Sequence, residues 1–65
     1  MFTKDNTNGL YSSALLNEMN SALEKMLGTD TGWIREQNEK NFSDLICEVA
    51  VDGMTSEDII AATKR

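Results

Sequence analysis

The sequence predicts a small all-α fold, either a three-helix bundle or a helical hairpin followed by a short C-terminal helix. Two long segments carry apolar residues at intervals of three and four, which is the spacing of one helix face. No segment alternates apolar and polar residues with the period of two typical of a strand, and proline is absent. The 65 residues suffice for one domain only, which we place at residues 10–65.

Residues 1–9 are predicted to form a flexible N-terminal arm. They read MFTKDNTNG, a polar stretch without apolar periodicity. Phe2 is the one aromatic residue of the arm. We interpret it as part of a frayed terminus, the alternatives being that it packs back onto the domain or anchors a partner.

The first helix is predicted over residues 12–27. Ser12 or Ser13 caps its start, and Tyr11, just before it, is placed to pack onto its first turns. Gly28 supplies the left-handed residue that ends it. One face carries seven apolar residues: Leu15, Leu16, Met19, Ala22, Leu23, Met26 and Leu27.

The second helix is predicted over residues 33–51, with Asp30 or Thr31 as its cap. Its first half is polar on all sides, whereas its second half has an apolar stripe. We favour one continuous helix because neither Gly nor Pro interrupts it, the alternative being a break at Asn41. Trp33 at its start is expected to cover the core between helix ends, or else to anchor an interface. The stripe consists of Phe42, Leu45, Ile46, Val49 and Ala50.

The third helix is short and is predicted over residues 56–64. Thr55 is a good N-cap, and Glu57 and Asp58 place acid in the first turn, where the helix dipole favours it. Ile59, Ile60 and Ala62 are expected to face the core.

The absence of histidine and the presence of one cysteine, Cys47, limit the chemistry of the chain. They exclude an internal disulfide, a structural zinc site and any Ser-His or Cys-His arrangement. We therefore expect no enzymatic activity, no metal and no cofactor. Cys47 is expected to be a partly buried filler, because its sequence neighbours are acidic and a reactive thiol needs nearby positive charge.

Acidic residues outnumber basic ones by eleven to six, which gives a net charge of −5. Such a chain repels nucleic acid and anionic membranes. No apolar run approaches the ~20 residues that a membrane span needs, and the first residues do not resemble a signal peptide. With the lone cysteine, these features predict a cytoplasmic protein, of a bacterium or of a host cell carrying a phage.

Self-association is expected, because a domain of this size buries only about 60% of its unfolded surface and small scaffolds need further stabilisation. The wide stripe of the first helix favours a globular homodimer over a rod. The candidate interface residues are Leu15, Met19, Leu23, Met26 and Trp33.

An acidic row in the second helix suggests a partner of opposite charge. Asp44, Glu48 and Asp52 are spaced by four residues, so they would share one helix face. Such a row usually faces water, but it could also contact a basic partner.

These features lead us to expect a protein-interaction module that regulates or inhibits a macromolecular partner. In general character the chain resembles the accessory proteins of phages and mobile elements, a likeness carried by no motif. One alternative is a nucleic-acid mimic that uses the acidic row to occupy a basic groove.

The other alternative is a helix-turn-helix DNA binder formed by residues 49–64. Its turn would be formed by Gly53 and Met54, with Ile59 and Ala62 packing behind it. Glu48 and Asp52 lie where that motif packs apolar side chains. Glu57 and Asp58 lie where it meets phosphates, which argues against it.

Overall fold

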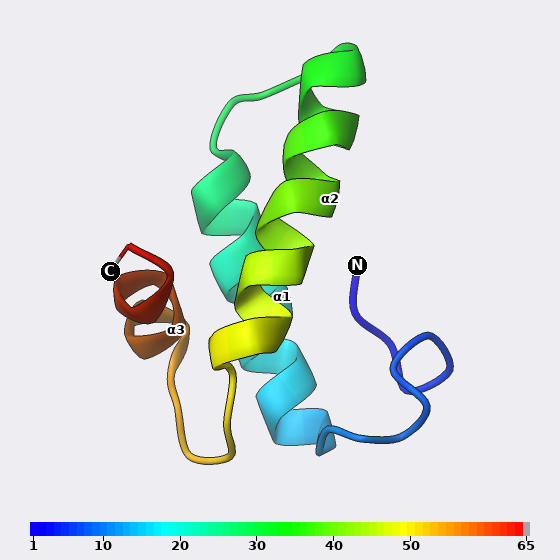
Figure 1. The fold of residues 1–65 in the computed structure, drawn as a ribbon, viewed down its shortest axis with the longest axis vertical. Helices are drawn as coiled ribbons and strands as arrows, with labels where there is room; N and C mark the ends of the chain where they lie inside the picture. Colours follow the sequence, from blue (N-terminus) through cyan, green and yellow to red (C-terminus); the bar gives the residue numbers. More distant parts are fainter. Residues whose placement is uncertain (65) are drawn as a thin grey trace.

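The computed structural model describes residues 1–64 and shows three helices with no strand in that range. They are α1 (Ser13–Leu27), α2 (Gly32–Val49) and α3 (Ser56–Thr63). The all-α prediction is confirmed, and the predicted ends are correct to within two residues. In Figure 1, α1 and α2 form a hairpin, α3 lies across one side of it, and the N-terminal segment lies along the other side.

Local capping explains where α1 begins and ends. The Ser12 hydroxyl accepts a hydrogen bond from the Leu15 backbone N–H at 3.1 Å, which satisfies one of the free donors of the first turn. At the other end Gly28 has a φ of 57°, and its N–H donates to the Glu24 carbonyl. A side chain at this φ would be strained, so glycine is the residue suited to this turn.

The helix α2 is continuous through Asn41, so the alternative with a break there is wrong. Thr31 takes the N-cap position but makes no side-chain capping bond. Asp30 accepts a hydrogen bond from the Asn38 side chain at 2.7 Å instead. Arg35 forms an ion pair with Glu24 of α1 at 2.9 Å, so the polar first half of α2 contacts α1 through polar side chains.

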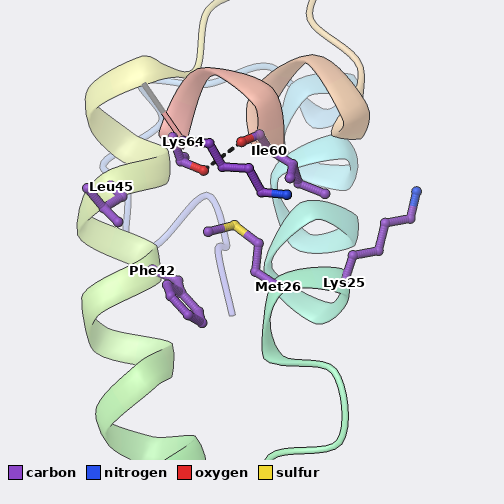
Figure 2. A pocket seen from close by; sticks show the side chains of 7 residues that line it. Lys25, Met26, Phe42, Leu45, Ile60 and Lys64 are labelled. Carbon is purple, nitrogen blue, oxygen red and sulfur yellow. Dashed lines mark hydrogen bonds between the residues drawn. The ribbon is translucent and has the colours of Figure 1, made fainter.

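The short helix α3 is held by a full capping box. The Thr55 hydroxyl accepts from the Asp58 N–H, and the Asp58 carboxylate accepts from the Thr55 N–H, both at 3.2 Å. Glu18 of α1 accepts a further bond from the Ser56 N–H at 3.0 Å. These contacts fix the start of α3 on α1, and from there the helix crosses towards α2 (Figure 2).

Most residues of the hydrophobic core belong to α1. Of its seven stripe residues, only Met26 is left half-buried. The chain exposes 4376 Å², close to the ~4100 Å² expected for a folded monomer of this mass. One chain therefore covers the α1 stripe without a second copy, and the homodimer stays a prediction. The buried apolar residues are Phe2, Leu15, Leu16, Met19, Ala22, Leu23, Leu27, Ile46, Ala50 and Ile59.

The N-terminal segment packs onto the hairpin through Phe2. The Phe2 side chain is buried, and its backbone is bound at two points by the Asn20 side chain of α1. Asn20 accepts from the Phe2 N–H at 2.7 Å and donates to the Phe2 carbonyl at 2.9 Å. The interpretation of Phe2 as part of a frayed terminus is therefore wrong, whereas the flexibility of residues 1–9 as a whole stays a prediction.

Candidate interaction surface

The candidate interface residues of the sequence do not form one surface. Leu15, Met19 and Leu23 are buried in the core of the single chain, so their side chains are not available to a partner in this structure. Met26 is half-buried at the edge of that core. Trp33 is 72% exposed at the start of α2, so the expectation that it covers the core is wrong.

Of the two long helices, α2 is less buried than α1. Ile46 is its only fully buried residue, and Leu45, which the sequence stripe placed in the core, is 38% exposed. Ile34 is exposed nearer the start of the helix. This arrangement follows from the polar first half, which gives α1 little apolar surface to pack against. The unpartnered apolar side chains of the hairpin therefore belong to α2 and not to α1.

A groove of about 370 Å³ opens where the three helices meet. Figure 2 shows Met26 of α1 and Phe42 of α2 facing each other below α3, with Ile60 of α3 above them. Leu45 forms the edge on the α2 side. The remaining lining residues are Thr63 at the end of α3, Lys64 directly after it and Lys25 of α1. None of the described residues that line the groove is acidic.

The two lysines of the groove differ in what they bind. The Lys25 ammonium turns away from the groove, where it donates to Glu57 at 2.7 Å and to the Ser56 hydroxyl at 3.0 Å. Within residues 1–64, Lys64 takes part in no ion pair, and its side chain extends across the groove (Figure 2). The groove therefore presents a cation beside apolar side chains.

The Lys25 pair also changes the protonation of Glu57. The hydrogen bond from Lys25 is the largest cause that lowers the pKa of Glu57 to about 2, followed by its own backbone N–H, the Ser56 hydroxyl and the charge of Lys25. All of these favour the carboxylate form. The pair thus ties α3 to α1 at any pH well above 2.

The predicted acidic row does not exist as one helix face. α2 ends at Val49, and Ala50 takes an extended conformation, so Asp52 lies in the turn that follows. There it accepts a hydrogen bond from the Ser12 hydroxyl at 3.4 Å. Asp44 and Glu48 remain exposed on α2, and the continuous helix also places Lys40 one turn before Asp44. The row is reduced to two acids next to a base.

Cys47 is exposed, contrary to the expectation of a partly buried filler. It lies beside Tyr11 and the N-terminal segment. Burial is the main cause that raises the pKa of the Tyr11 hydroxyl, and the neighbouring Cys47 adds to it. Tyr11 packs against the edge of the core, as its position before α1 predicted.

The structure adds two observations on sites of other kinds. Within the described part of the chain, no three His, Cys, Asp or Glu side chains gather closely enough to hold a metal ion. Among residues 1–64, no helix combines the length and the apolar character that crossing a bilayer requires.

Comparison of the chain with protein-family models, with curated proteins and with solved structures finds no match. Sequence reasoning singled out Met26 but missed the groove, because its other walls come from α2 and α3. The sequence feature that could have indicated the groove is Leu45, because it lies at the edge of the predicted apolar stripe of the second helix and not at its centre.

Proposed function

We propose that this protein is a helical protein-interaction module that binds, and thereby regulates or inhibits, a macromolecular partner. The observation that carries the proposal is the open groove between α1, α2 and α3, where Met26, Phe42, Leu45 and Ile60 meet. The buried core of a protein–protein interface is more apolar than its rim, which is polar. The groove has this composition, and it is formed by side chains from all three helices.

Exposed apolar residues elsewhere on α2 extend the surface available to a partner. Trp33 and Ile34 lie slightly more than three turns before Leu45 on the same helix. Tryptophan is enriched among the residues that dominate binding energy. Self-association belongs to the same proposal, with Trp33 and Ile34 at the start of α2, and not the groove, as the contact surface.

The proposed setting is the cytoplasm of a bacterium, or of a host cell carrying a phage. A single free thiol suits a reducing compartment. The proposal includes no catalytic step.

The test is affinity capture with matched leucine variants. The wild-type chain, Leu45→Asp and Leu10→Asp are each immobilised and exposed to a bacterial lysate, and the captured proteins are identified by mass spectrometry. Leu10 is 78% exposed and is not among the residues lining the groove, so Leu10→Asp controls for an added charge on the surface. Circular dichroism checks that each variant remains helical.

We expect a protein captured by the wild type and by Leu10→Asp to be lost with Leu45→Asp, because a carboxylate at the groove edge would be desolvated by the partner. The proposal is wrong if no protein is captured reproducibly, or if Leu45→Asp captures the same protein in the same amount.

A further inference from the structure

We propose that the groove binds an acidic amphipathic helix of the partner, seating a bulky apolar side chain between Met26 and Phe42 and pairing a carboxylate with Lys64. The inference rests on the proposed function and specifies the chemistry of the segment that the partner supplies. Shape, available binding mode and charge each support it.

The groove has room for apolar anchors and has apolar walls to receive them. Its volume of about 370 Å³ lies at the lower end of the ~300–1000 Å³ typical of ligand sites. Phe42 and Met26 are only half-buried, and they face each other across it (Figure 2). Methionine adapts its shape to different neighbours. An inserted side chain would complete the burial of both residues.

The walls favour a helical partner over an extended one. The groove is flanked by α1 and α2 and is closed at one end by α3. Residues 1–64 contain no strand, so there is no sheet edge on which a partner strand could pair. Proline-rich segments bind grooves lined with several aromatic rings, whereas Phe42 is the only aromatic side chain among the described residues that line this groove. Of the three modes in which a partner segment binds as a strand, as a polyproline helix or as an α-helix, these walls fit the α-helix best.

The charge of the groove is opposite to that of the whole chain. The chain carries eleven acidic and six basic residues, yet none of the described residues that line the groove is acidic, and the Lys64 side chain extends across it. Apolar residues next to a cation that pairs with no acid of residues 1–64 are complementary to an apolar side chain next to a carboxylate. The chain as a whole attracts cations, so a preference for an acidic segment can arise only locally.

The test uses two synthetic fluorescein-labelled peptides of the same length. Both carry leucines at intervals of three and four, and the positions between them are all Glu in one peptide and all Lys in the other. Binding to the full chain is measured by fluorescence anisotropy at 0.15 M salt, where the Debye length is about 8 Å. We expect the Glu peptide to bind at least about threefold more tightly than the Lys peptide, the scale of one exposed ion pair.

Variants of the chain locate the preference. Lys64→Glu should weaken binding of the Glu peptide about five- to tenfold and strengthen binding of the Lys peptide, because the pairing charge is reversed. Lys40→Glu makes the same change of charge on the exposed side of α2 and should have little effect. If Lys64→Glu disturbs the end of α3, Lys64→Gln removes the charge without adding an acid there. Leu45→Asp should weaken the binding of both peptides.

Three results would overturn the inference. The first is failure of the Glu peptide to bind, or binding no tighter than that of the Lys peptide. The second is an equal loss with Lys64→Glu and Lys40→Glu, which would mean that the effect comes from net charge. The third is a wild-type dimer that Leu45→Asp dissociates in sedimentation, which would make a second copy of the chain the occupant.

Failure of this inference is distinguishable from failure of the proposed function. If the peptides show no charge preference while lysate capture still depends on Leu45, the groove binds a partner of other chemistry. If capture does not depend on Leu45 either, both proposals are wrong.

Discussion

Replacing Leu23 with alanine should remove a large part of the free energy that keeps this chain folded. Leu23 is 2% exposed and belongs to the same buried cluster as Met19, Ile46 and Ile59. Truncating a buried leucine to alanine costs about 2–5 kcal/mol, from lost burial and from the cavity left behind. A chain of 65 residues has a total stability of about 3–10 kcal/mol. The substitution should therefore lower the free energy of unfolding by between about a fifth of its total and the whole of it.

The measurement is urea unfolding followed by circular dichroism of the helices. Fluorescence is a poor probe here, because Trp33 is already exposed in the folded chain and its surroundings change little on unfolding. With a slope of about 1 kcal/mol per molar urea, a loss of about 3 kcal/mol lowers the midpoint by about 3 M. The corresponding fall in melting temperature is at least about 12 °C.

The matched control is Leu10→Ala, the same change at an exposed site. It should alter the free energy of unfolding by less than about 0.5 kcal/mol. If Leu23→Ala and Leu10→Ala unfold at the same urea concentration, Leu23 is not in the core and the packing of α1 described above is wrong.

Four further predictions concern the contacts of α3, the N-terminal segment, self-association and nucleic acid. Because the pKa of Glu57 is lowered to about 2 from 4.5, its contribution to stability is present above 4.5 and is lost as pH falls towards 2. Glu57→Gln should flatten the pH dependence of the urea midpoint in that window, and parallel curves would contradict this. Asn20→Ala should cost about 1–2 kcal/mol, since it removes two hydrogen bonds to Phe2, and should speed hydrogen exchange at the Phe2 amide. An unchanged exchange rate at the Phe2 amide would show that contacts other than those with Asn20 hold the N-terminal segment. Sedimentation at tens of micromolar, roughly the Kd of a weak interface, should show a dimer that Trp33→Ala weakens; a monomer alone would end the homodimer proposal. Gel-shift titrations at low and high salt should show no DNA binding, because α3 opens with exposed Glu57 and Asp58; a salt-sensitive complex would support the helix-turn-helix alternative.

The helices themselves follow from local signals in the sequence. Ser12 and Thr55 cap α1 and α3 with the hydrogen bonds that their positions predicted, and Gly28 ends α1 with a positive φ. These features depend on residues within one helical turn of each other, so they are readable without the tertiary structure. The core face of α1 was predictable for the same reason, because its apolar spacing is regular over four turns.

The functional surface depends on contacts between residues distant in the sequence. Asp52 is not part of the acidic row because α2 ends at Val49. Phe2 is held against α1 by two hydrogen bonds between its backbone and the Asn20 side chain. Trp33 is exposed because the first half of α2 meets α1 through polar side chains such as Arg35. No periodicity encodes these pairings.

The groove is the clearest case of this kind. The sequence by itself determined three helices, the N-caps of α1 and α3, and the apolar face of α1. Only the tertiary structure decided that α3, fixed to α1 by Ser56 and Glu57, crosses the hairpin where it leaves Met26 and Phe42 half-covered. The physical reason is length: eight residues of α3 span about 12 Å, too short to cover the whole seam between α1 and α2.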